Sequence, residues 1–166
     1  MPRTPRPFAK QIDGADAVVV AIGSGTTAPW LEAAKNIVSA AAALHEGRPY
    51  IIHMGGGATL LGSDGKPFLE SEHFPTEFLP PAKGQAEALA WYRENADDLG
   101  VNWTYVSPPP VDFATGERTG LYRTSLDTPV VAEDGSSTAS YEDFAVAVID
   151  EVEVPRFVGR RFTIGY

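Results

Sequence analysis

The fold is decided by one stretch of the sequence, Ala15-Asp16-Ala17-Val18-Val19-Val20-Ala21-Ile22, which is followed by Gly23-Ser24-Gly25. Its apolar, β-branched residues predict a strand that is buried on both faces. Strands of this kind belong inside a parallel sheet. The glycines that follow mark a turn, so we expect a helix to come next.

The rest of the chain continues this alternation. Pro29 suits the first turn of a helix whose apolar residues recur at helical spacing as far as Leu44, and Gly47 ends it. Further strands are predicted over residues 50–54, 102–107 and 161–164, and further helices over residues 83–99 and 141–152. The last of these helices begins with a capping box, Ser140-Tyr141-Glu142-Asp143. Strands that alternate with helices predict an α/β fold with a largely parallel sheet.

Two segments carry no sustained periodicity. Residues 60–81 are rich in Gly, Pro, Asp and Glu, and residues 108–138 mix turn residues with short extended pieces at 122–124 and 129–131. We expect both to be long loops over one end of the sheet, where long loops often cover a ligand. The length of 166 residues is that of one domain, so residues 1–166 are predicted to form a single domain.

The first predicted strand poses a problem of position. Only a short Pro-rich arm precedes it, so the strand would be left at the edge of the sheet with unpaired backbone groups. Either a second copy covers that edge, or a piece of the natural domain is missing. We therefore expect an N-terminally truncated domain, or a homodimer formed through the strand near residues 17–22.

The composition excludes several kinds of partner and site. Lys and Arg number 13 against 22 Asp and Glu, and the net charge of −9 argues against nucleic acid as a partner. There is no cysteine, which rules out disulfides, thiolate metal ligands and cysteine nucleophiles. The basic residues 1–7 are not followed by an apolar run of signal-peptide length, and no apolar stretch is long enough to span a bilayer. We expect a cytoplasmic protein with no membrane partner.

Candidate ligand sites follow three of the predicted strands, because ligands of open α/β sheets bind at the carboxyl ends of the strands. The segment 23–25 could offer backbone N–H groups to a ribose or pyrophosphate just ahead of a helix, or could be only a glycine turn. The glycines 55–57 could admit a flat nicotinamide-like ring, or could form a flexible turn. The segment 107–109 could form a rigid pocket wall.

Other chemical sites receive less support. His45, His53 and His73 share no metal-ligand spacing, so we expect no metal site. The glutamates of the 60–81 loop could supply paired carboxylates for acid–base work, although a solvated acidic loop is the simpler interpretation. Those residues are Glu70, Glu72 and Glu77. Neither a Gly-x-Ser-x-Gly elbow nor a P-loop occurs.

Several of these segments, in order, resemble one protein family. Residues 14–23 resemble the fourth-strand entry of short-chain dehydrogenase/reductase proteins, and residues 54–58 resemble the fifth-strand end in an atypical NAD(P)H-binding branch of that superfamily. That branch includes flavin- and biliverdin-reductase-like proteins and nitrogen-repressor-like redox sensors. Residues 103–109 resemble its sixth strand and proline turn, and residues 140–145 its late helix start. The resemblance implies a Rossmann-like fold with helices on both faces of the sheet.

The sequence also departs from the family pattern. No Gly-x-x-Gly-x-x-Gly turn is present to hold a pyrophosphate, and the segment that distinguishes NAD from NADP is missing with it. Lys83 resembles the lysine of the family's Tyr-x-x-x-Lys pair and could reach a ribose hydroxyl, or could be a solvated lysine at a helix start. Leu79 stands at the tyrosine position and cannot donate a proton. The catalytic residues therefore stay unidentified.

The leading hypothesis is an NAD(P)H-binding, oxidoreductase-like protein that reduces a small organic or flavin-type substrate without the Tyr-Lys pair. Hydride transfer would then rely on proximity and orientation. The alternatives are a non-catalytic dinucleotide-sensing or protein-interaction module, and a fragment that no longer binds NAD or NADP. The residues expected to line the cofactor cleft are Gly23, Ser24, Gly25, Gly55, Gly56, Lys83, Ser107 and Pro108.

Overall fold

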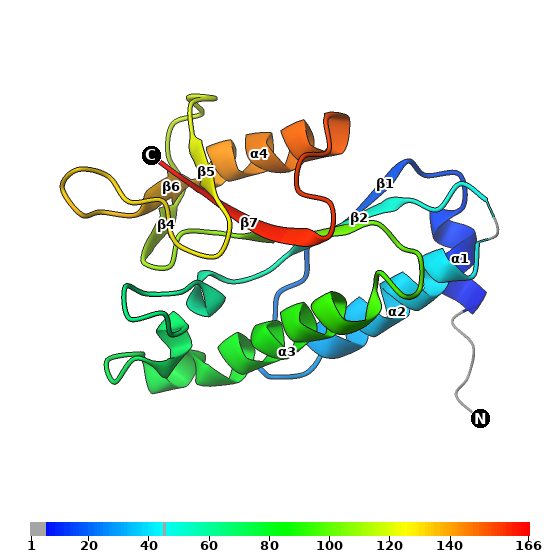
Figure 1. Cartoon of the computed structure of the whole chain (residues 1–166), viewed down its shortest axis with the longest axis horizontal. Coiled ribbons are helices and arrows are strands. Elements are labelled where there is room, and N and C mark those ends of the chain that lie inside the picture. Colours follow the sequence, from blue (N-terminus) through cyan, green and yellow to red (C-terminus); the bar gives the residue numbers. More distant parts are fainter. Residues whose placement is uncertain (1–5, 45) are drawn as a thin grey trace.

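The computed structural model describes residues 6–44 and 46–166, so the arm at residues 1–5 and His45 lie outside the described residues. Its main sheet has five strands in the order β1-β2-β3-β7-β5 (Figure 1). They are β1 (Ala17–Val20), β2 (Tyr50–Met54), β3 (Trp103–Ser107), β7 (Arg160–Gly165) and β5 (Arg123–Ser125). The first four are parallel, and β5 runs antiparallel to β7. The predicted α/β fold with a mostly parallel sheet is confirmed.

Helices cover both faces of this sheet, as expected. The helices α1 (Arg6–Ile12), α2 (Trp30–Ala42) and α3 (Leu79–Asn95) lie on one face, and α4 (Tyr141–Glu153) lies on the other (Figure 1). Each face therefore has its own apolar core. Trp103 and Tyr105 of β3 belong to the core under α2 and α3, whereas Val106 belongs to the core under α4. This alternation is the period-two pattern of a strand buried on both sides.

The first strand is less buried than its composition predicts. β1 is an edge strand, as expected, but Val19 is 41% exposed, and β1 is only partly covered. The prediction of burial on both faces is therefore wrong for this strand. The short helix α1, which the sequence did not predict, places Ile12 in the core beside α2 and leaves Phe8 exposed.

The predicted helix at 83–99 begins earlier and ends earlier than expected. α3 starts at Leu79, with Pro80 and Pro81 inside its first turn. Proline is tolerated there because the N–H groups of the first turn have no partner within the helix. The chain leaves α3 at Asn95 and turns at Gly100, whose φ of +66° suits glycine.

The two predicted loops contain more order than expected. The first holds the 3₁₀ turns η2 (Phe68–Glu70) and η3 (Thr76–Phe78), and η1 (Gly57–Thr59) directly precedes it. The second contributes β5 and pairs β4 (Asp112–Ala114) with β6 (Thr138–Ser140) in a small parallel sheet. Residues 129–131, predicted as extended, form no strand.

The start of α4 has the predicted Ser140 N-cap but not the complete capping box. Ser140 is the N-cap, and its Oγ accepts a hydrogen bond from the backbone N of Asp143 at 3.0 Å. Asp143 does not reach back to complete the box; its carboxylate instead accepts from the backbone N of Gly120 at 2.8 Å and from the Tyr166 hydroxyl at 2.8 Å. The cap thus also fastens the chain terminus and the 119–120 turn. Within the described ranges, no helix has the length and apolarity needed to cross a membrane.

Candidate functional site

Helix α3 brings together the loops that follow β1 and β2. A Cβ built on Gly84 would lie 2.1 Å from the backbone oxygen of Thr27, in the loop after β1. A Cβ built on Gly56 would lie 1.7 Å from Oε1 of Gln85, the next residue of α3. Two adjacent residues of one helix therefore contact the two loops that the sequence assigned to ligand binding.

The loop after β3 joins the same group. A Cβ on Gly57 would lie 2.7 Å from the backbone oxygen of Pro108, so η1 packs directly on the proline turn. The backbone N of Gly55 donates to the Val106 oxygen at 2.8 Å, which continues the β2–β3 pairing up to this point. The carboxyl ends of three neighbouring parallel strands thus meet next to the first turns of α3, as expected for an open α/β sheet.

The glycines after β2 are required by packing. The ring of Tyr105 occupies the space that a Gly55 side chain would need, with Cε1 only 1.8 Å from the built Cβ. The Tyr105 hydroxyl donates to the backbone oxygen of Gln85 at 3.1 Å and fastens α3 to the sheet. Burial raises the pKa of Tyr105 well above its ordinary value of 10, so the group stays protonated and acts as a fixed donor.

The segment after β1 has the opposite character. A Cβ built on Gly23 or Gly25 would meet no atom within 4 Å, and both glycines are exposed. The Oγ of Ser24 accepts from the backbone N of Thr26 at 3.1 Å, and the Trp30 indole donates to the Thr26 oxygen at 3.0 Å. The loop is therefore held by its own hydrogen bond and by the Trp30 indole, and open space remains next to its glycines.

The other predicted site residues lie close to these loops. Lys83 is exposed on α3, directly before Gly84. Pro108 is half-buried. Ser107 is fully buried, and its Oγ has no hydrogen-bond partner in the described part of the chain. Contact between this hydroxyl and a ligand would require the residues that cover it to move.

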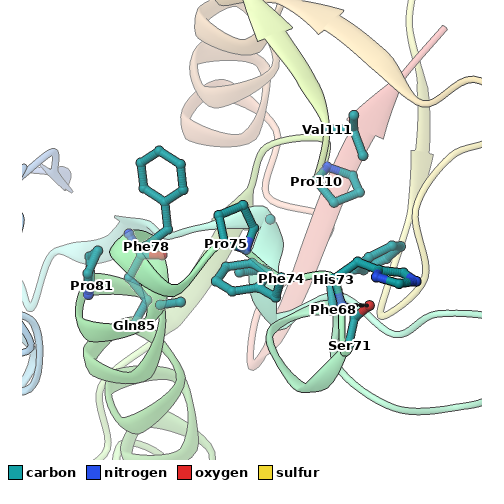
Figure 2. Close-up of a pocket in the computed structure, with 13 residues that line it drawn as sticks. Phe68, Ser71, His73, Phe74, Pro75, Phe78, Pro81, Gln85, Pro110 and Val111 are labelled. Carbon is teal, nitrogen blue, oxygen red and sulfur yellow. Dashed lines mark hydrogen bonds between the residues drawn. The ribbon is translucent and has the colours of Figure 1, made fainter.

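The structure adds a pocket that sequence reasoning did not resolve into residues. It has a volume of about 530 Å³, within the range of small-molecule sites. In Figure 2, Phe74 and Pro75 lie between the α3 residues Pro81 and Gln85 and the segment that carries Pro110 and Val111. The lining residues are Gly57, Ala58, Phe68, Ser71, His73, Phe74, Pro75, Phe78, Pro81, Ala82, Gln85, Pro110 and Val111.

The sequence carries one signal for this pocket, which is its aromatic content. Three phenylalanines, at 68, 74 and 78, lie in a Gly- and Pro-rich segment where a solvated loop would carry few aromatic residues. Phe78 is 58% exposed and lines the pocket. The predicted 60–81 loop supplies these phenylalanines to the pocket wall. No local sequence pattern shows that Pro110 and Gln85 line the same pocket.

An ion pair between buried Arg161 and partly exposed Asp127 holds the η1 turn beside this pocket. Arg161 of β7 is 2% exposed, and its Nη1 donates to the Thr59 backbone oxygen at 2.8 Å and to Thr59 Oγ1 at 2.9 Å. Its Nε donates to Asp127 at 2.9 Å, and Asp127 also accepts from Arg93 of α3 at 2.6 Å. Partial burial of Asp127 works to raise its pKa, but the two guanidinium groups outweigh it and hold the pKa below its usual range.

His53 lies under the site but has no access to it. It is fully buried, stacks on Tyr105 with ring centroids 5.1 Å apart, and its Nδ1 lies 3.1 Å from the Tyr92 hydroxyl. Burial lowers the pKa of His53 to about 4, so the imidazole is neutral at pH 7. Among the described residues, no group of three or more His, Asp or Glu is placed to hold a metal ion.

Comparison with known proteins places this geometry in context. No family model matches the chain. The crystal structure of a "putative exported protein" from Burkholderia pseudomallei is 31% identical, with a TM-score of 0.85 over 98% of this chain and 77% of that one. A "putative NADH-flavin reductase" of Streptococcus pneumoniae is 32% identical, with a TM-score of 0.79 over 95% of this chain and 74% of that one.

A more distant structure shares the fold alone. It is a short-chain dehydrogenase/reductase from Veillonella parvula in complex with NADP, 17% identical with a TM-score of 0.61 over 99% of this chain and 69% of that one. This likeness agrees with the Rossmann-like fold that the sequence resemblance implies. The uncharacterized protein YwnB of Bacillus subtilis is 32% identical over 160 residues, which are 94% of this chain and 73% of YwnB. The chain belongs to the family of YwnB.

Proposed function

We propose that this protein binds NAD(P)H and reduces a small organic or flavin-type acceptor. The observation that carries the proposal is the meeting of three strand-end loops at the first turns of α3, directly beside a pocket of about 530 Å³. Such an arrangement would suit a dinucleotide along the strand ends and a second reactant in the adjoining pocket. The similarity to the "putative NADH-flavin reductase" of Streptococcus pneumoniae supports the same reaction class.

The chain offers groups that suit an anionic dinucleotide. The space beside Gly23 and Gly25 is open, and α2 follows with no side-chain cap on its first-turn N–H groups. Such an amino terminus favours a phosphate through its free donors and its dipole. The proposed cofactor site comprises Gly23, Ser24, Gly25, Gly55, Gly56, Lys83, Ser107 and Pro108.

The protein's contribution to the reaction is positioning. NAD(P)H would supply a hydride to the acceptor, which takes up one proton from solvent while NAD(P)⁺ leaves. Gly55 and Gly56 would offer only their backbone to the cofactor, since Tyr105 and Gln85 occupy the space that a Cβ at either position would need. Lys83 would contact the ribose or a phosphate. Since Leu79 stands where the family's proton donor would be, the rate would depend on proximity and orientation.

A matched pair of lysine variants tests the cofactor site. We expect NADH or NADPH to raise the melting temperature, and Lys83→Met to weaken nucleotide binding by about tenfold, measured by calorimetry, since a single charged contact contributes about this much. Lys66→Met is the control, because Lys66 is an exposed lysine outside both the proposed cleft and the pocket lining.

The outcomes separate the proposal from its alternatives. Hydride transfer is followed by the loss of nicotinamide absorbance with flavin, quinone and carbonyl acceptors. Nucleotide binding without turnover on any acceptor would favour a dinucleotide-sensing module. No effect of either nucleotide on melting temperature would overturn the proposed cofactor site and favour a chain that does not bind nucleotide.

A further inference from the structure

The loop that forms the pocket alternates ring-bearing residues with carboxylates. Phe68, Phe74 and Phe78 line the cavity, and Pro75 lies between two of them (Figure 2). Aromatic rings and prolines offer flat apolar surfaces on which a planar ring stacks. Gln85 contributes an amide at the α3 side, where it is held beside Gly56.

Within residues 68–78, the segment that supplies the phenylalanines, the charged residues are all glutamates, and His73 of this segment lines the pocket. No lysine or arginine is among the lining residues. Glu70, Glu72 and Glu77 are exposed on the same segment that supplies the phenylalanines, and the whole chain carries a net charge of −9. A ligand with an anionic group would therefore lie near three carboxylates of this segment, which are exposed beside the pocket lining, with no lysine or arginine in the lining to offset them.

We propose that this pocket takes planar aromatic acceptors that carry no anionic group. Stacking on the phenylalanines would hold the ring, and the three carboxylates would exclude phosphorylated or sulfonated forms of the same molecule. The role as an acceptor site rests on the proposed reductase function. The selectivity of ring binding does not, because it needs no nucleotide.

Riboflavin and flavin mononucleotide test the charge selectivity, because they share one ring system and differ by a phosphate. Binding is measured without nucleotide, from the quenching of flavin fluorescence. At low ionic strength we expect riboflavin to bind about tenfold more tightly than the phosphorylated form, and added salt to narrow the difference through screening. Equal or tighter binding of flavin mononucleotide would overturn the proposal, as would failure of both flavins to bind.

Charge variants then locate the source of the selectivity. The triple change Glu70→Gln, Glu72→Gln and Glu77→Gln should bring the two affinities to within about twofold. The control triple, Glu94→Gln, Glu117→Gln and Glu133→Gln, removes the same charge from exposed positions outside the pocket lining and should keep most of the difference. If both triple variants reduced the affinity difference equally, the net charge of the protein would account for the selectivity. That result would overturn the assignment of the selectivity to Glu70, Glu72 and Glu77.

A phenylalanine pair tests the stacking surface. Phe78 is 58% exposed and Phe8 is 48% exposed, so neither truncation removes a core side chain. Phe78→Ala should weaken riboflavin binding by about fivefold, whereas Phe8→Ala should leave it unchanged. If Phe78→Ala has no effect, the pocket is not the ring site. If ring binding follows these expectations while NAD(P)H neither binds nor reacts, the reductase function fails and the pocket assignment stands.

Discussion

At the scale of single residues, His53 couples the stability of the fold to pH. The imidazole is fully buried, and burial lowers its pKa from 6.5 to about 4. Between these two values the unfolded chain binds a proton that the folded chain does not, so stability rises with pH across this window. We expect His53 alone to reduce the free energy of unfolding by about 3 kcal/mol as pH falls from 7 to 4.

Denaturant unfolding across this pH range measures the effect. His53→Phe preserves the stacking on Tyr105 and, combined with Tyr92→Phe, removes both members of the hydrogen bond. The double variant should lose most of the slope of the free energy of unfolding against pH between pH 4 and 6.5. His73→Asn, at an exposed histidine, is the control and should keep it. An unchanged slope in the double variant would contradict the prediction.

At the scale of elements, Gly84 sets how closely α3 approaches the loop that precedes α2. A Cβ at this position would lie 2.1 Å from the Thr27 oxygen and 2.5 Å from the Trp30 ring, and the nearer atom is backbone. Gly84→Ala should therefore destabilise the fold by about 1–3 kcal/mol, even though alanine favours helix. Thermal unfolding measures the change.

Gly25→Ala is the matched control, because its added Cβ meets nothing within 4 Å. Its melting temperature should stay within a degree or two of the parent, while its affinity for NAD(P)H should fall if residues 23–25 line the cofactor cleft. A loss of stability as large as that of Gly84→Ala would contradict this account of the two loops.

The ion pair of Arg161 and Asp127 joins three elements, and its cost of disruption is set by Arg161, because Arg161 is buried while Asp127 is 44% exposed. Asp127→Asn leaves the charge of Arg161, which is 2% exposed, without its partner and should cost about 3 kcal/mol in urea unfolding. Arg93→Ala removes the other, 46% exposed partner of Asp127 and should cost less than about 1 kcal/mol. Similar losses of unfolding free energy in the two variants would mean that water solvates the unpaired charge of Arg161 better than its burial implies.

At the scale of the whole molecule, the free edge of β1 predicts association. Val19 is 41% exposed there, beside a groove of about 460 Å³ whose walls include Phe8 and Ile37. We expect the chain to self-associate through residues 17–22 at micromolar concentration, with Val19→Lys shifting it toward monomer in sedimentation velocity. Val158→Lys is the control, at a position that is 43% exposed and away from β1, and it should not shift the chain toward monomer. A monomeric parent whose β1 amides exchange freely would contradict the prediction.

The elements of the fold were more predictable than the site. The strands at β2 and β3, the capped start of α4 and the glycine-marked strand ends follow from local periodicity and turn residues. The strands β4 and β6 did not, because three residues carry too little pattern, and neither did α1, whose seven residues make fewer than two helical turns. Cytoplasmic location and the missing glycine-rich unit stay predictions.

By itself, the sequence determined the alternation of the main strands and helices and the segments that follow the strands, because these depend on neighbouring residues, and the alternation in turn implied a largely parallel sheet. Only the tertiary structure decided what those segments contact. Arg161 meets Thr59 across 102 positions of sequence, and Gln85 fills the space that Gly56 leaves. The aromatic pocket likewise joins the 68–78 loop to Pro110. Contacts of this range arise from packing, which no local pattern encodes.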